Sequence, residues 1–176
     1  KVTCYQYRKN GILHMTYAFI FPGQGSQYVG MGKNLITDFP NSKHVFEQLD
    51  DELSQNLTDI ILDGPEDQLI LTENAQPALF AVSIAIVRVL RDEFGLDLSK
   101  IGKFAAGHSL GEYSALAAFD SIKFSDGVKI LKARGKAMQA AVSNGKGAMA
   151  AILGLNALAV EKIVETAAQE NEICCI

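Results

Sequence analysis

The sequence predicts an α/β fold built around a parallel sheet. Strand-like and helix-like segments alternate along the chain, which is typical of strands joined by crossover helices. The first strand-like segment, 16–21, is apolar on both faces, as expected of a buried parallel strand. With 48% hydrophobic and 20% charged residues, the 176-residue chain has the composition of a folded globular domain.

Each element is predicted from local periodicity and from residues that start or stop helices. In 43–53 the apolar residues repeat at helical spacing and fall on one face. Segment 76–94 is apolar almost throughout, so we expect a largely buried helix there. In chain order, the predicted elements are a strand over 16–21, helices over 43–53, from Pro65 and over 76–94, a strand over 103–107, a helix over 110–119 and a helix that is capped by Ser125 and runs to about residue 142.

A glycine-rich break at residues 144–147 predicts a second, smaller unit. We expect a strand over 148–153, a helix over 156–169 and the start of another strand over 172–176. The chain does not begin with Met, and Met15 stands directly before the first strand. We therefore interpret residues 1–14 as a non-native or disordered extension. The predicted organisation is this extension, an incomplete core over 15–143 and a truncated small unit over 144–176.

Composition excludes several classes of function. The net charge is −4 and no Lys/Arg run is present, so binding to nucleic acid has no electrostatic support. The longest apolar stretch, 77–87, is too short to span a membrane. The three cysteines lack the spacing of a metal site or a disulfide framework. We therefore expect a cytoplasmic protein with no bound metal.

The segment Gly107-His108-Ser109-Leu110-Gly111 carries the clearest chemical signal. It reads G-x-S-x-G, in which a serine on a sharp strand-to-helix turn acts as a nucleophile. The pattern arises by chance in roughly one chain in twenty of this length, so a turn without catalytic use is the alternative. Here it follows an apolar strand and precedes an alanine-rich helix, which is the context that the chemistry requires. Ser109 is therefore predicted to be a nucleophile in acyl chemistry.

The loop Gly23-Gln24-Gly25, directly after the first strand, is a candidate for the oxyanion hole. Such a hole takes one backbone N–H from the residue after the nucleophile, here Leu110, and another from a separate loop. Gln24 is the candidate for the second donor, because its loop follows a strand at the carboxyl edge of the sheet. The alternatives are a plain turn and a phosphate site, but the loop lacks the complete phosphate-binding pattern.

The polar partners of Ser109 are less clear from the residues alone. Arg134 lies in an amphipathic helix beside Lys129, Lys132 and Lys136, and all four can be solvated; alternatively, Arg134 clamps a substrate carboxylate. No histidine follows Ser109, although the nucleophile-elbow order places one there. His108 is a poor candidate for the base, because neighbours on a sharp turn point apart. The chain therefore lacks an evident general base.

Four motifs in order resemble the malonyl-CoA:acyl carrier protein transacylases of fatty-acid synthesis. They are Phe21-Pro22-Gly23-Gln24-Gly25-Ser26-Gln27, Gln76-Pro77-Ala78, Gly107-His108-Ser109-Leu110-Gly111-Glu112-Tyr113 and Arg134-Gly135-Lys136-Ala137-Met138-Gln139. The likeness covers about residues 16–176 and roughly the first half of such an enzyme. It implies an α/β-hydrolase-like core with an inserted ferredoxin-like subdomain, which would begin near residue 146.

The resemblance also implies a role for each candidate residue. Ser109 would form the malonyl ester, with Gln24 and Leu110 as the oxyanion donors and Arg134 as the partner of the malonyl carboxylate. Gln76, His108 and Met138 would line the site. The implied substrates are malonyl-CoA and acyl carrier protein, with no tightly bound cofactor. The family's catalytic histidine would lie beyond Ile176, so the chain by itself is expected to be inactive, and a separately encoded C-terminal half is one source of the base. A serine thioesterase of related fold and a non-catalytic remnant that binds CoA or carrier protein are the alternatives.

Overall fold

The computed structural model describes residues 2–9, 12–141, 150, 152–168 and 173–176. The chain divides into two compact units, Lys1–Ala141 and Val142–Ile176, and each unit is described by itself. All of the candidate site residues belong to the first unit.

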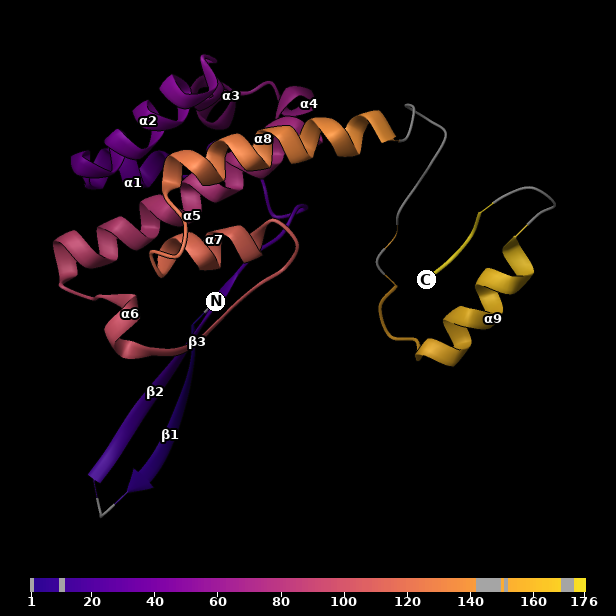
Figure 1. Cartoon of the computed structure of the whole chain (residues 1–176), viewed down its shortest axis with the longest axis horizontal. Coiled ribbons are helices and arrows are strands. Elements are labelled where there is room, and N and C mark those ends of the chain that lie inside the picture. Colours follow the sequence, from indigo (N-terminus) through magenta and orange to yellow (C-terminus); the bar gives the residue numbers. More distant parts are fainter. Residues whose placement is uncertain (1, 10–11, 142–149, 151, 169–172) are drawn as a thin grey trace. The chain divides into compact units, whose positions relative to one another are not determined.

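The first unit combines a three-stranded sheet with helices (Figure 1). The strand order is β1-β2-β3; β1 pairs with β2 antiparallel, and β2 pairs with β3 parallel. The alternation in the sequence thus correctly predicts an α/β fold with a small parallel sheet. The elements are β1 (Val2–Lys9), β2 (Ile12–Phe21), α1 (Lys33–Asp38), the 3-10 helix η1 (Pro40–Ser42), α2 (Lys43–Leu53), α3 (Leu57–Asp63), α4 (Glu66–Leu69), α5 (Thr72–Phe94), α6 (Leu98–Ile101), β3 (Gly102–Gly107), α7 (Gly111–Ala118) and α8 (Phe124–Ala141).

The strands differ from prediction in two ways. Residues 1–14 are expected to lie outside the fold, but Val2–Lys9 form β1 and β2 already begins at Ile12. The strand over 16–21 is expected to be buried on both faces, whereas the side chain of Ile20 is 46% exposed beside the buried Phe19 and Phe21. Phe104, on β3, is 69% exposed. A run of apolar residues predicts a strand but does not show whether other segments of the chain cover both of its faces.

Helix α5 is the central element of the core. It begins at Thr72, four residues before its predicted start at residue 76, and most of its side chains are buried. By length and composition α5 could cross a membrane, but 72% of its apolar window is buried inside the structure, as in the core helix of a folded domain. Pro77 lies inside this helix and lacks the N–H that would bond to the preceding turn.

Helices α5 and α8 lie against each other along much of their lengths (Figure 1). The rings of Phe80 and Phe124 stack with centroids 5.3 Å apart. Farther along α8, Gly135 meets the first turn of α5 so closely that a Cβ there would lie 2.5 Å from Glu73 Cα and 2.7 Å from Thr72 O. The missing side chain of Gly135 therefore sets the distance between these two helices.

The second unit contains one described helix, α9 (Ala157–Ala167), in agreement with the helix predicted over 156–169. Asn156 caps it, because its side-chain oxygen accepts a 2.9 Å hydrogen bond from the N–H of Ala159. Of the strand predicted over 148–153, residues 148, 149 and 151 lie outside the described residues, and the described residues 150, 152 and 153 form no strand. Residues 173–176 are described and form no strand, contrary to the predicted strand start at 172–176.

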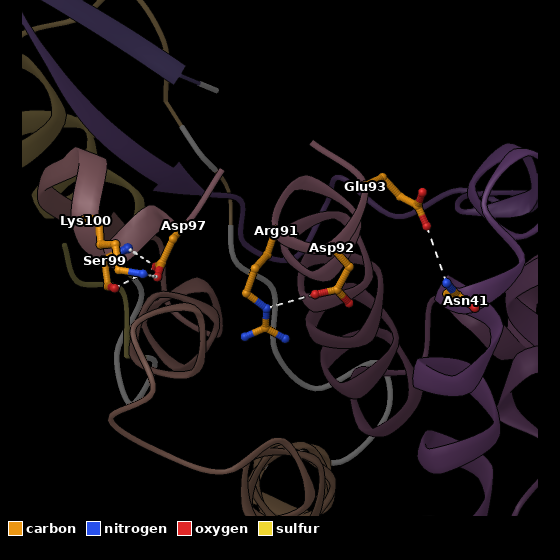
Figure 2. A network of polar contacts seen from close by, with 7 residues as sticks. All are labelled: Asn41, Arg91, Asp92, Glu93, Asp97, Ser99 and Lys100. Carbon is orange, nitrogen blue, oxygen red and sulfur yellow. Dashed lines mark hydrogen bonds and ion pairs between the residues drawn. The ribbon is translucent and has the colours of Figure 1, made fainter. Parts of the chain in front are cut away.

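A small polar cluster caps the N-terminus of α6, the short helix that leads into β3. The Asp97 carboxylate accepts hydrogen bonds from the N–H and the hydroxyl of Ser99, at 3.0 and 2.6 Å, and lies 2.9 Å from Lys100 Nζ (Figure 2). The Ser99 hydroxyl, followed by Lys100, lowers the pKa of Asp97 from 3.8 to about 2. The nearby pairs Arg91–Asp92 and Asn41–Glu93 also link exposed side chains at this end of α5 (Figure 2).

We predict that Asp97 contributes to the acid sensitivity of the fold. Because its pKa is lower in the folded chain, its stabilising effect is complete above the unfolded value and is lost as pH falls from 3.8 toward about 2. Asp97→Asn should therefore reduce the loss of stability between about pH 5 and about pH 2.5, measured by urea unfolding. Ser99→Ala should give an intermediate result. An unchanged pH dependence in Asp97→Asn would contradict the prediction.

We also predict that Gly135→Ala destabilises the first unit. The added methyl group would meet backbone atoms of α5, and such overpacking costs about 1–3 kcal/mol, which exceeds the gain of up to ~1 kcal/mol in helix propensity. Urea unfolding measures the difference. Lys136→Ala on the exposed side of α8 is the control and should change stability by less than about 0.5 kcal/mol. A Gly135→Ala protein as stable as the wild type would show that α8 can shift freely.

Candidate active site

Ser109 occupies a strained turn between β3 and α7. Its φ of 55° lies in the left-handed region, which side chains other than glycine rarely adopt. The backbone folds back so tightly that a Cβ on Gly107 would overlap the carbonyl carbon of Gly111, 1.9 Å away. A Cβ on Gly111 would in turn lie 2.5 Å from Phe21 O at the end of β2. Both flanking glycines are thus required sterically for this sharp strand-to-helix turn, on which Ser109 is half-buried.

The loop after β2 lies directly beside this turn. A Cβ on Gly23 would lie 2.3 Å from His108 Nδ1, so Gly23 and His108 are in contact. The loop is held by its own hydrogen bonds: the Ser26 hydroxyl donates to Gly23 O at 2.7 Å. In the described part of the chain, no protein acceptor pairs with the backbone N–H of Gln24 or of Leu110. Two N–H groups beside Ser109 or in the adjoining loop are therefore without a protein acceptor in the described residues.

Arg134 reaches Ser109 from α8. Its Nη2 donates a 3.0 Å hydrogen bond to Ser109 Oγ, and its Nη1 donates a 2.6 Å hydrogen bond to Gln76 Oε1. Its guanidinium carbon lies 6.0 Å from the ring centroid of Tyr113. The side chain is half-buried, yet no carboxylate among the residues that the structure describes forms an ion pair with it. Arg134 is thus a positioned cation beside the nucleophile without an anionic partner.

Gln76 links Arg134 to the end of α8. It is fully buried on α5, accepts from Arg134 through its amide oxygen and donates through its amide nitrogen to Met138 Sδ at 3.3 Å. Because the oxygen and the nitrogen of the amide each have a partner, its orientation is defined. The structure therefore brings Gln76, Met138, Arg134 and Ser109 into one series of contacts, as the motifs predict.

No general base is hydrogen-bonded to Ser109 within the described residues. The bond recorded for its hydroxyl oxygen comes from Arg134, and an arginine cannot accept the proton. His108 is exposed and its ring lies against Gly23. His44 pairs with Glu47 on α2, at 2.9 Å.

Charged groups near the site do not form a metal centre. Among the described residues, no group of three or more His, Cys, Asp and Glu side chains could hold a metal ion.

Two cavities of about 480 and 690 Å³ are lined by residues near the sheet, and neither is lined by Ser109 or Arg134. The apolar 480 Å³ cavity is therefore not the candidate active site, which is located instead by the side-chain contacts of Ser109 and Arg134.

Several neighbours of the site are not predicted from the sequence. Thr72 Oγ1 accepts from Gln24 Nε2 at 3.3 Å, which joins the loop after β2 to the start of α5. Tyr113 faces the Arg134 guanidinium. Lys132, expected to be solvated like its neighbours, is instead hydrogen-bonded between helices. Tyr113 lies within a recognised motif and Thr72 lies four residues before another, which was the available signal; for Lys132 the helical pattern offers none.

Comparisons with known proteins identify relatives of this chain. Residues 18–171 match the acyl transferase domain family. The chain is 44% identical over 156 residues to the malonyl CoA-acyl carrier protein transacylase of Bacillus subtilis (strain 168), which covers 89% of this chain and 48% of that protein. The structure of this chain resembles that of the acyl-carrier-protein-S-malonyltransferase from Bartonella henselae. The two have 55% sequence identity and a TM-score of 0.81, over 87% of this chain and 48% of that one.

A further solved relative is a malonyl-transacylase in complex with a type II PKS acyl-carrier protein. It has 41% identity and a TM-score of 0.79, over 87% of this chain and 48% of that one. The chain thus spans about half the length of the relatives that it matches. Since the family match extends over most of the sequence and includes the Ser109 turn and Arg134, the chain belongs to the acyl transferase domain family.

Proposed function

We propose that this chain carries the nucleophile and the carboxylate clamp of a malonyl-CoA:acyl carrier protein transacylase. One observation carries the proposal: Arg134 is half-buried, has no carboxylate partner in the described part of the chain, and hydrogen-bonds to both Ser109 Oγ and Gln76. A guanidinium presents a planar fork that matches a carboxylate. An acyl group with a terminal carboxylate would supply the missing anion.

The proposed reaction begins with attack of Ser109 Oγ on the thioester carbonyl of malonyl-CoA. The C–S bond breaks, CoA leaves as its thiol, and the malonyl group stays on Ser109 as an ester. The phosphopantetheine thiol of the carrier protein then attacks this ester, takes the malonyl group and returns the proton to Ser109. The unpaired N–H groups of Gln24 and Leu110 support a role as donors to the oxyanion in both steps.

Arg134 would act differently before and after acylation. In the free chain its Nη2 is occupied by the Ser109 hydroxyl. An ester oxygen is a weaker acceptor, so acylation would release this donor at the moment when the malonyl carboxylate arrives nearby. Gln76 would hold the other side of the fork, and Met138 and His108 would line the pocket. This exchange of partners favours an acyl group that carries a carboxylate over one that does not.

The proton acceptor in this proposal comes from elsewhere in the protein. In this proposal, a further segment packs against β3. Support comes from the exposed Phe104, from the exposed middle of β3 and from a groove of about 690 Å³ between β3 and α7. We propose that the remaining half of the relatives' length, on the same chain or on a separate one, covers it and supplies the base. The complete core would be α/β-hydrolase-like, with 144–176 belonging to an inserted ferredoxin-like subdomain.

The proposal includes no tightly bound cofactor, a cytoplasmic location, and CoA thioester and carrier protein as the substrates. The lack of a base bonded to Ser109 in the described residues favours one alternative, a non-catalytic remnant that binds CoA or carrier protein. A simple serine thioesterase is the other alternative, but it has no need for the unpaired Arg134. The two experiments that follow separate these functions.

We predict that Arg134 selects acyl groups that carry a carboxylate. In the chain supplemented with the remaining half of a relative, Arg134→Met should slow acylation of Ser109 by malonyl-CoA about 30-fold, because hydrogen bonds to a charged group contribute about 2 kcal/mol. Acylation by acetyl-CoA should stay within about twofold of the wild type. Intact-protein mass spectrometry measures both rates. Ser109→Ala, which should remain unlabelled, is the control, and equal losses with both donors would favour the thioesterase.

We also predict that the chain by itself transfers malonyl groups at least about 100-fold more slowly than the supplemented protein, since a general base contributes roughly 10²–10⁴. Transfer to carrier protein is followed by mass spectrometry of the phosphopantetheine thiol. The supplemented Ser109→Ala protein serves as the blank. Turnover by the chain alone at the rate of a complete relative would overturn the need for a second half, and no turnover even after supplementation would favour the remnant.

A further inference from the structure

A partly buried polar cluster joins α5 to α8 next to the candidate site but does not touch Ser109. We call it the Lys132 cluster; it consists of Lys132, Asn74, Gln55 and the backbone oxygen of Gln68. Lys132 Nζ donates 2.9 Å hydrogen bonds to Asn74 Oδ1 and to Gln55 Oε1. Asn74 Nδ2 donates to Gln68 O at 2.9 Å, and Gln55 Nε2 lies 3.3 Å from Asn74 Oδ1. The donors and acceptors of Asn74 are thus matched.

Burial makes this cluster sensitive to the loss of any member. Asn74 is only 3% exposed, and the Lys132 side chain is 14% exposed. The pKa of Lys132 is lowered, chiefly by burial, and the Glu73 carboxylate lies 3.9 Å away, beyond hydrogen-bond distance. A partly buried ammonium group that is hydrogen-bonded to neutral oxygens, with a carboxylate only at 3.9 Å, depends on those oxygens staying in place. The cluster therefore fixes the distances between the segments that carry Lys132, Asn74 and Gln55.

The cluster and the Arg134–Gln76 contact flank the closest approach of the two helices. That approach is at Gly135, which meets Glu73. Successive helix residues are rotated by about 100° around the axis, so Lys132 lies about 60° to one side of Gly135 and Arg134 about 100° to the other. On α5, Asn74 and Gln76 lie on opposite sides of Glu73 by the same arithmetic. Two attachments on opposite sides of one contact prevent α8 from rolling on α5.

We propose that Lys132 and Asn74 are positioning residues, which hold α8 at the rotation that places the Arg134 fork against Ser109 and Gln76. The consequence for selectivity rests on the proposed function; the effect on the position of Arg134 does not. A small roll of α8 would carry Nη1 and Nη2 out of reach of Gln76 and Ser109, because both bonds need the side chain in one place. Lys132 thus affects the acyl clamp without contact to the substrate.

The test replaces Lys132 by methionine, which keeps the length of the side chain and removes its donors. Lys136→Met is the matched control, because Lys136 is exposed one turn along α8. Lys132→Arg, which retains the charge and the donors, should keep most of the wild-type behaviour in both measurements. The primary measurement is solvent exchange of the Arg134 Nη–H protons by ¹⁵N NMR on the chain as it stands, and it requires no activity. The second measurement is the ratio of malonyl to acetyl labelling of Ser109 in the supplemented protein.

In Lys132→Met we expect exchange at Arg134 to rise about tenfold and the malonyl-to-acetyl ratio to fall about tenfold, the effect of losing a hydrogen-bonded position of a charged group. Lys136→Met should change neither. If Lys132→Met does not fold, Gln55→Ala removes one acceptor at the edge of the cluster and should act in the same direction.

Unchanged exchange at Arg134 in a folded Lys132→Met or Gln55→Ala protein would overturn the positioning role. A faster exchange in a protein whose wild type shows no preference for malonyl would support the positioning role and refute the proposed function. The two proposals can therefore fail separately.

Discussion

The close contact between α5 and α8 is the constraint on which the candidate site depends. Gly135 has no side chain, so the backbone of α8 can touch the first turn of α5. Only at that distance can Arg134 reach Gln76 and Ser109 with both arms of its guanidinium. The Phe80–Phe124 stack holds the same helices together at a second point. The site thus depends on backbone packing before it depends on any polar interaction.

The Ser109 turn depends on a second close approach, between the ends of two parallel strands. Gly111 lies against Phe21 O, and Gly23 lies against the His108 ring, so the loop after β2 and the turn after β3 fit together because these two glycines have no side chains. Strain at Ser109, with its φ of 55°, is maintained by this packing. Ser109 is consequently half-buried, while the backbone around it is held in one conformation.

Local signals predicted much of the fold and of the site. The bounds of α2 agree with the predicted helix, because its apolar period is clear and its ends are marked. The start of α5 was missed since Thr72, Glu73 and Asn74 are polar and resemble a loop, although tertiary packing makes them helical. Ser109, Gln76, Arg134 and Met138 were found through motifs, and the structure brings them together. The chemical roles assigned to them remain proposals.

The sequence by itself determined the features that depend on neighbouring residues: the glycines that permit the Ser109 turn, the helical periods and the order of strands and helices. Only the tertiary structure decided which polar side chains are buried. Lys132 and Lys136 stand on the same helix, yet Lys132 is enclosed by Asn74 and Gln55, whereas Lys136 is exposed. The physical reason is that periodicity defines the faces of a helix, while the burial of each face depends on distant segments that pack against it.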